Sequence, residues 1–421
     1  MPTVKRRLPE HPHLDVPRRE ARELLEACQS GSRDALDRIR RRHPKLKDAP
    51  ENAAPIAHLK LSDAQLVIAR EYGFSTWAML KARIGAHAAA GALAEAIRAD
   101  DRAAVVRILR ATPEMLHLPV WSGDWGPPMS HAANLGRLEI VQTCAELGAR
   151  DHQHAFDRAV LQGKIECAHW LVKQGAKAEP GVIMGACETL NAEGVRLLAE
   201  LNAPFINGHG DRLAPLALVL ETYGRNPAGK HAILEIFAAR GYELPETPMM
   251  AFHRGDLTQL KKHLRHDPQL LERRFTLREI YPAECGCAAR GQAGMHWTSI
   301  DGTTLLHLAV DFREREIFYW LLTHGADPNA RATVDGDDFG GHTPLFNAVV
   351  CGPWPDAGMA RVLLEHGADG NMRASLRKFL DWIENPHWHE THNVTAREWG
   401  HTFPEKHWVN REALQLLDES P

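Results

Sequence analysis

The chain has 421 residues, of which 44% are hydrophobic and 25% are charged, and its formal net charge is −4. This length allows two or three ordinary domains or one long repeat array, and the composition is that of a folded protein. The small net charge excludes a strong general attraction to nucleic acid or membrane surfaces, and no apolar run approaches the roughly 20 residues that cross a bilayer.

The N-terminus and the cysteines bear on the cellular compartment. Residues 1–17 are rich in proline and charge and lack the apolar segment of a secretory signal, so we expect a loose arm. The seven cysteines have no disulfide-framework spacing, which predicts reduced thiols. We therefore expect a soluble, cytoplasmic protein.

An N-terminal helical region is predicted to follow, starting at Arg18. Its phrase LSDAQLVIAREYGFSTWAMLKARI (61–84) predicts two helices. Ser62 is expected to cap the first helix and Gly73 to end it, and Ser75 or Thr76 starts the second.

The next section carries divergent helix pairs. Gly148, Gly175 and Asn202 recur at intervals of 27 residues. Glycine and asparagine both tolerate the left-handed backbone that ends many helices. A repeat this short keeps two helices and leaves little room for an extended finger between repeats.

The clearest pattern is DGTTLLHLAVDFREREIFYWLLTHGADPNA (301–330), and a second copy follows it directly. Thr304 is expected to cap the first helix with its hydroxyl, and Gly325 to end the second helix. His307 is expected to hydrogen-bond within or between neighbouring repeats. Pro344 takes the first helical position of the second copy, where proline is favoured.

These phrases are ankyrin-repeat signatures. The chain resembles bacterial ankyrin-repeat proteins with an N-terminal DAQxxIAREYGFxxW-type phrase, here Asp63 to Trp77, and is similar to them again at TLREIYPAECGC (276–287) and RASLRK (373–378). The resemblance implies binding to other proteins and no enzymatic activity. The chain departs from the usual ankyrin-repeat pattern at Leu305, where proline is common.

We predict an all-α repeat solenoid of roughly eight stacked helix-turn-helix repeats with short β-hairpin fingers. Its predicted parts are a flexible arm (1–17), a helical region (18–88), divergent repeats (89–271), an insertion loop (272–300), two well-formed repeats (301–372), and a loop with a capping repeat (373–421).

Three tryptophans are the leading partner-binding candidates. Trp121 and Trp125 fall on an expected finger, and Trp354 falls in an insertion between two helices. Exposed indoles often dominate binding energy, whereas indoles that fold back onto the repeats serve the core. Asp335 and Asp337 join the candidates, although their run VDGDDFGG also fits a solvated hairpin tip, because the glutamate that closes a calcium loop is absent.

The segment ENPHWHETH supplies the weak metal candidates His387, His389 and His392. It has neither a HExxH nor a paired-cysteine pattern, so a polar loop explains it better. Cys285 and Cys287 are too close for an unstrained disulfide and are interpreted as incidental thiols.

The basic run made of Arg38, Arg40, Arg41 and Arg42 has no interleaved aromatic residues, so a solvated helix face is favoured over a nucleic-acid contact. No phosphate-binding glycine loop or nucleophile elbow occurs in the sequence. We therefore expect no cofactor and no enzymatic activity.

The function predicted from the sequence is a non-catalytic scaffold that presents a repeat surface to a protein partner. The alternative is a small-ligand or metal site, or an undetected enzyme, where segments 272–300, 331–342 and 379–393 meet.

Overall fold

The computed structural model describes residues 6, 8–9, 13–46, 59–120, 125–289, 296–351, 357–380, 383, 385–404 and 406–419. The chain divides into two compact units, each taken by itself below. The first comprises Met1–Ala159 and Glu166–Ala176, and the second comprises Val160–Ile165 and Lys177–Pro421. None of the helices in the described ranges combines the length and apolarity that a bilayer crossing requires.

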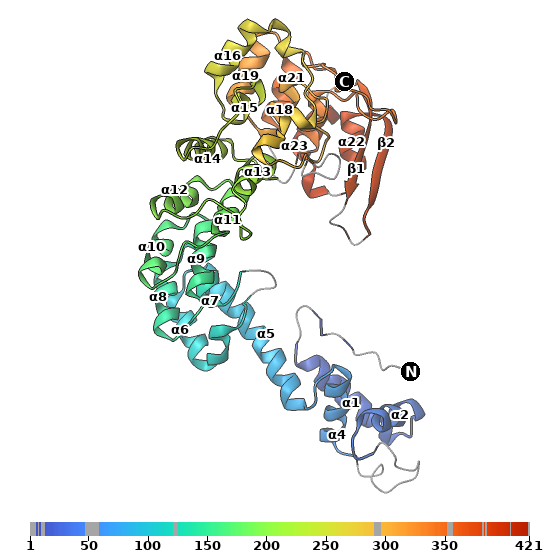
Figure 1. The fold of residues 1–421 in the computed structure, drawn as a ribbon. Helices are drawn as coiled ribbons and strands as arrows, with labels where there is room; N and C mark the ends of the chain where they lie inside the picture. The colour runs from blue at the N-terminus through green and yellow to red at the C-terminus, as the bar shows by residue number, and fades with distance from the viewer. Residues whose placement is uncertain are drawn as a thin grey trace. The chain divides into compact units, whose positions relative to one another are not determined.

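The first unit consists of helices (Figure 1). They are α1 (Asp15–Gln29), α2 (Arg33–Arg42), α4 (Leu61–Glu71), α5 (Trp77–Arg98), α6 (Arg102–Ala111), the 3-10 helix η1 (Pro113–His117), α7 (Pro128–Leu135), α8 (Leu138–Glu146), α9 (His152–Leu161) and α10 (Ile165–Lys173); the unit boundary falls within α9 and at the start of α10.

Helices α1, α2 and α4 pack into a small bundle around Leu24, Ile39 and Ile68. Two details differ from the prediction. α1 begins at Asp15, inside the segment that was expected to be a loose arm. α4 is capped at Lys60 and not at Ser62, because the Asp63 carboxylate, two residues into the helix, accepts the Lys60 N–H at 2.8 Å.

The basic run on α2 is occupied by contacts within this bundle. Arg38 makes two hydrogen bonds to the Glu71 carboxylate, at 3.0 and 2.9 Å. Arg40 and Arg41 lie 3.6 and 4.0 Å from the Asp37 carboxylate. These pairs favour the predicted interpretation of the run as a helix face over a nucleic-acid contact.

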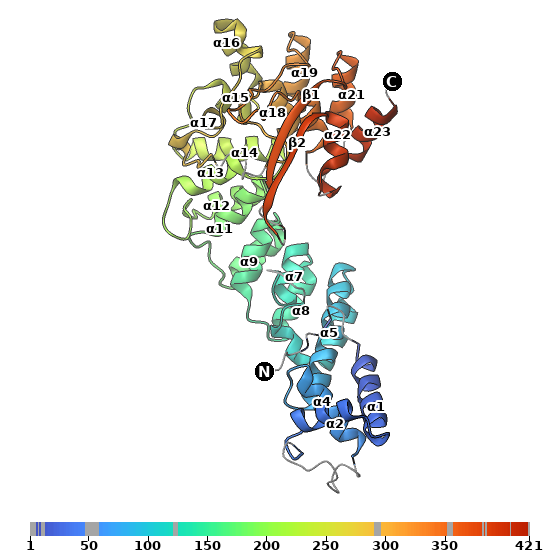
Figure 2. The same ribbon diagram turned by 90° about the vertical axis from the view of Figure 1, so that its right-hand side faces the viewer.

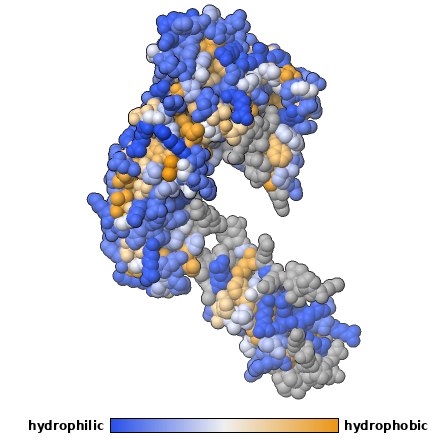
Figure 3. All heavy atoms as spheres, in the orientation of Figure 1, coloured by the Kyte–Doolittle hydropathy of each residue, from blue (hydrophilic) through white to orange (hydrophobic). Residues whose placement is uncertain are grey.

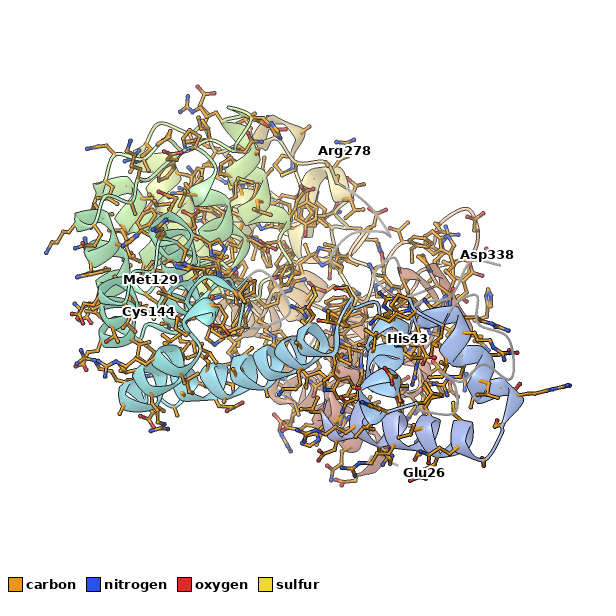
Figure 4. All side chains as sticks on the ribbon, turned by 90° about the horizontal axis from the view of Figure 1, so that it is seen from below. Glu26, His43, Met129, Cys144, Arg278 and Asp338 are labelled. Carbon is orange, nitrogen blue, oxygen red and sulfur yellow. The ribbon has the colours of Figure 1, made fainter. Side chains whose placement is uncertain are left out.

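The predicted helix stops are found in both units. Gly148, Gly175 and Asn202 have φ values of 100°, 99° and 54°, and Gly325 has 89°. The left-handed backbone therefore recurs at the sequence interval that predicted it. In the first unit, the core between the helices includes Met129 and Cys144, and neither is exposed (Figure 4).

The second unit continues with further helix pairs and ends in a mixed segment (Figure 1). Its elements are α11 (Val182–Glu188), α12 (Ala192–Glu200), α13 (Leu213–Glu221), α14 (Pro227–Ala239), α15 (Pro248–His253), α16 (Leu257–His266), η2 (Pro268–Leu271), α17 (Leu277–Ile280), η3 (Ala283–Cys285), α18 (Leu305–Phe312), α19 (Arg315–Thr323), α20 (Pro344–Val349), α21 (Gly358–Glu365), β1 (Arg373–Leu380), β2 (His387–Thr395), α22 (Ala396–Thr402), η5 (Lys406–Trp408) and α23 (Arg411–Glu419).

Neighbouring pairs stack helix on helix in this unit. α18 packs on α20 and α20 on α22, while α12 packs on α14. The core between them includes Phe318, Phe346 and Trp399, all of which are buried. Each pair therefore buries its apolar faces against its neighbours, as repeat arrays do.

The expected insertion loop, residues 272–300, is partly helical. It holds α17 and η3 and is anchored to the following repeat. The Phe275 N–H donates to the Thr303 carbonyl at 2.8 Å, and the Gly302 N–H donates to the Phe275 carbonyl at 2.9 Å.

The expected polar loop at 379–393 is instead part of an antiparallel β-hairpin. β1 pairs with β2 from Arg373 opposite Thr395 to Leu380 opposite His387, with a bulge between Ala374 and Leu376. Figure 2 shows the two strands running side by side along the second unit. The chain is mostly helical, as predicted, but the loop predicted for this segment was wrong. Every second residue of β1 is buried, which is a strand pattern.

Candidate functional site

The finger of residues 331–342 is the first part of the candidate site. Its turn is closed by the Asp335 carboxylate, which accepts the N–H groups of Asp337 at 2.9 Å and Phe339 at 3.0 Å. Burial alone would raise the pKa of Asp335, but those two N–H groups and the nearby Arg377 guanidinium hold this pKa below its ordinary value. Asp338, at the tip, points away from the helices (Figure 4).

The finger is joined directly to the hairpin. The Gly340 N–H donates to the Ser375 carbonyl at 2.7 Å, so the finger forms a bridge at the edge of β1. Along β1, Leu376 and Leu380 are buried, whereas Arg377 and Phe379 lie on the other, partly exposed side.

Arg377 connects the finger to that exposed side. Arg377 Nη2 lies 2.8 Å from Asp335 Oδ2, and Arg377 Nη1 lies 2.9 Å from Asp337 Oδ2. Its guanidinium lies 4.7 Å from the ring centre of Phe339 and 5.6 Å from that of Trp388. The two stacking contacts and the two ion pairs hold the Arg377 guanidinium in one orientation. The surface around this guanidinium is therefore rigid.

We call the set Val334, Asp335, Phe339, Arg377, Phe379 and Trp388 the finger–hairpin surface. Trp388 lies opposite Phe379 in the register, with ring centres 5.3 Å apart, and remains 45% exposed. Val334 is 53% exposed. The visible surface of the molecule is mostly hydrophilic (Figure 3), and Trp388 is one of its exposed aromatic residues.

A cavity of about 150 Å³ lies beside this surface. The segments around it come from the insertion, the start of the following repeat, the finger and β1, so only two of the three segments predicted to meet, 272–300 and 331–342, line it. β1 contributes Ser375 to Arg377, and not the predicted 379–393. The polar residues of its wall are Thr276, Ser299, Asp301, Thr333, Asp335, His342, Ser375 and Arg377.

The predicted tryptophans do not build this site. Trp121 and Trp354 lie outside the described residues. Trp125 belongs to the first unit, where it is half-buried with its ring centre 5.1 Å from that of His131. Asp335, in contrast, belongs to the finger–hairpin surface, and Asp337 is paired with Arg377 of that surface at 2.9 Å.

The three histidine candidates for a metal lie on β2 in different surroundings. His389 is half-buried with its ring 5.5 Å from Trp399, whereas the His392 ring packs 5.0 Å from Phe339. His387 is bonded to the Asn385 carbonyl at 2.9 Å. Within the described ranges, no group of three His, Cys, Asp or Glu residues has a geometry that could hold a metal ion.

The histidines of the repeat phrases have structural roles, as predicted. His307 Nε2 donates to the His342 carbonyl at 3.1 Å, which links two successive repeats. The Thr304 hydroxyl donates to His307 Nδ1 at 2.9 Å, and Thr304 and His307 form a capping box at the start of α18. His324 and His366 each bond the carbonyl one turn earlier, at 2.8 Å.

Cys285 and Cys287 are both buried free thiols. Burial raises the pKa of Cys285 to about 11 and that of Cys287 further. Because only a thiolate is a strong nucleophile or metal ligand, burial disfavours the reactive form of both thiols.

A second cluster of charged groups lies inside the second unit. The Arg225 guanidinium and the Asp311 carboxylate are 2.7 Å apart, and each side chain is 1% exposed. His296 Nδ1 lies 3.0 Å from Asp311 Oδ1; since a carboxylate only accepts, this nitrogen donates. The Tyr281 hydroxyl then donates to His296 Nε2. Burial would raise the pKa of Asp311, but Arg225 and His296 lower it to about 2.

Lys230 and His253 extend this cluster. Lys230 Nζ lies 2.7 Å from His253 Nδ1, and His253 Nε2 donates to the Ile280 carbonyl at 2.8 Å. Burial lowers the pKa of Lys230 to about 7 and that of His253 well below its ordinary value. The groups are enclosed by packed side chains, so we interpret the cluster as an internal brace and not as a reaction site.

Arg377, Phe379 and Trp388 were not predicted from the sequence as site residues. The alternation of Ala374, Leu376 and Leu380 was a usable signal for a strand. Nothing local marked Arg225 or Asp311, because their partners are far apart in sequence.

Residues 249–374 match the family model for ankyrin repeats, in three copies. The matched range runs from α15 into β1 and includes the finger. No curated protein matches the chain in sequence. Among solved structures, the ankyrin repeat domain of human ASB11 is similar, with 17% identity, coverage of 70% of this chain and 99% of that chain, and a TM-score of 0.26.

Proposed function

We propose that this ankyrin-repeat protein is a non-catalytic binding protein and that its partner, another protein, docks on the finger–hairpin surface. Ankyrin repeats generally serve as protein-interaction modules, and the matched range includes the finger. The remaining question is which part of the chain makes the contact.

The observation that carries the proposal is the exposure of Trp388 on a rigid support. The indole lies on Phe379 and beside the Arg377 guanidinium, which Asp335 and Asp337 hold in place. Binding hot spots are enriched in tryptophan and arginine, and a preorganised group loses less entropy on binding.

Two further parts of the proposal come from the sequence. We propose a place in the bacterial group with the DAQxxIAREYGFxxW-type phrase, which is supported by the capping role of Asp63 and the start of α5 at Trp77. We also propose a cytoplasmic location, because seven buried free thiols are stable in a reducing compartment.

The test is affinity capture from a lysate of the source organism with three forms of the full chain: wild type, W388A and Y319A. Tyr319, on α19, is the matched control because it is an aromatic residue of similar exposure, 50%. We expect a protein retained by wild type and Y319A and lost by W388A, with the helical circular dichroism of all three forms unchanged. Retention by W388A at the wild-type level would overturn the proposed surface.

A further inference from the structure

The cavity beside the finger–hairpin surface has a buried histidine in its wall. His342 lines it and is 1% exposed. Its Nε2 lies 2.9 Å from the Ser299 carbonyl, which only accepts, so the proton resides on Nε2 and Nδ1 carries a bare lone pair. In the described part of the chain, this Nδ1 has no hydrogen-bond partner.

The lone pair on His342 Nδ1 stays unprotonated at neutral pH. Burial lowers the pKa of His342 to about 4. At neutral pH the ring is therefore an acceptor on this side. A buried acceptor without a donor is costly, so a ligand that supplies a donor would gain from it.

The charges around the cavity also favour a cation. Arg377 is the basic residue of the wall, and Asp335 and Asp337 already neutralise it. Asp301 is exposed and makes no ion pair in the described ranges. Its Oδ1 accepts the Leu277 N–H at 2.8 Å, which leaves Oδ2 for a ligand.

The size and the walls fit a side chain. A volume of about 150 Å³ is far more than one water molecule needs. Phe339 and Leu376 supply apolar wall next to the polar groups, and long basic side chains combine an apolar stem with a charged head in the same way.

We propose that this cavity receives a basic side chain, arginine or lysine, of the protein partner, with Asp301 as its ionic contact and His342 as an additional acceptor. This inference rests on the proposed function, because the partner that docks on the neighbouring Trp388 would bring the side chain into reach.

Ligand-observed saturation-transfer NMR on the full chain tests this inference, with N-acetyl-arginine methylamide and the corresponding lysine, citrulline and norleucine compounds as probes. We expect the arginine or the lysine compound to bind with a dissociation constant on the order of millimolar. The neutral citrulline and norleucine compounds should bind at least about tenfold more weakly, since they lack the charge.

Two variants locate the binding. D301N keeps an oxygen that can accept the Leu277 N–H and removes the charge, so it should weaken binding of the basic probe at least about tenfold. D338N is the matched control, because Asp338 is an exposed carboxylate of the same finger outside the cavity wall. It should bind as the wild type does.

The inference is overturned if neither basic probe binds, if citrulline binds as well as arginine, or if D301N and D338N behave alike. These failures are distinct from failure of the proposed function. Loss of probe binding with partner capture still dependent on Trp388 removes the cavity only, whereas capture that is insensitive to W388A removes the docking surface.

Discussion

At the scale of single residues, the second unit depends on buried charges that are paired. Arg225 and Asp311 are both 1% exposed, and Arg225 also donates to the Asp311 carbonyl at 2.8 Å. Removing one partner of a buried ion pair strongly destabilises a protein, because the other charge is left buried and unpaired. Exposed ion pairs contribute little to stability. This contrast gives a quantitative prediction.

Arg225→Met should lower the free energy of unfolding by about 3–5 kcal/mol, because it leaves the Asp311 carboxylate buried without its cation. Equilibrium urea unfolding followed by circular dichroism measures this loss. Arg254→Met is the control: the Arg254–Glu235 pair is 2.7 Å long but 30% and 58% exposed, and its loss should cost under about 1 kcal/mol. Equal losses in the two variants would refute the role of the buried pair.

Lys230 makes stability depend on pH in a defined direction. Burial lowers its pKa to about 7 from 10.5, and the nearby Glu314 carboxylate offsets part of that effect. Between pH 7 and 10.5, Lys230 therefore holds a proton in the unfolded chain that it has released in the folded chain. Lys230 thus makes the free energy of unfolding rise with pH in that window, and its destabilising effect is largest below pH 7.

We expect the stability of Lys230→Met relative to wild type to be highest below pH 7 and to decrease steadily toward pH 10. The variant also loses the hydrogen bond to His253, so the diagnostic quantity is the change of this difference with pH and not its value at one pH. Urea midpoints of both proteins at a series of pH values check this. A difference that stays constant from pH 6 to pH 10 would show that Lys230 is not neutralised by burial.

At the scale of elements, the finger depends on one glycine. Gly340 has φ 122°, and a Cβ there would lie 2.1 Å from the Thr333 carbonyl oxygen. The same residue forms the bridge from the finger to Ser375. Its backbone conformation therefore determines whether the finger and β1 can meet.

Gly340→Ala should cost roughly 1–3 kcal/mol of stability or more and raise amide exchange in residues 333–342. Gly336, in the same finger, has open space around its Cβ position, so Gly336→Ala should change stability by less than about 0.5 kcal/mol. Hydrogen exchange with mass spectrometry and urea unfolding compare the two. Similar behaviour of both variants would contradict the geometry of the bridge.

The sequence predicts these elements unevenly. The glycine and asparagine stops, such as Gly148 and Asn202, were predictable because the left-handed backbone restricts residue type locally. The hairpin was not predicted, since β2 reads HWHETHNVT and has no clean apolar alternation. Its stability comes from pairing with β1, a contact outside its own segment.

The candidate site illustrates the same limit. Asp335 and Asp337 were predictable as a turn, because aspartate side chains accept nearby backbone N–H groups. Their ion pairs with Arg377 depend on the register of β1 against the finger, 40 residues later in the chain. No local pattern in the sequence indicates a contact between residues so far apart in the chain.

At the scale of the whole molecule, the last helix pair closes the stack of the second unit. Trp399 is fully buried and its Nε1 donates to the Thr298 hydroxyl at 3.1 Å, while the Asn410 N–H donates to the Val349 carbonyl at 2.8 Å. These contacts cover α20. Repeat arrays need such terminal caps to keep apolar repeat faces away from solvent.

A chain that ends at Thr395, without α22 and α23, should expose the apolar side of α20 and self-associate. Sedimentation velocity at several concentrations measures this against the full-length chain. A truncated protein whose sedimentation does not change with concentration, and whose unfolding midpoint is that of the full chain, would show that the cap is dispensable.

The most direct test of the central claim is hydrogen exchange of the full chain with and without the captured protein partner. If the partner docks on the finger–hairpin surface, exchange should slow in the finger, residues 331–342, and in β1 and β2, with little change in α1, α2 and α4. Protection confined to those N-terminal helices, with the finger and hairpin exchanging as in the free protein, would contradict it.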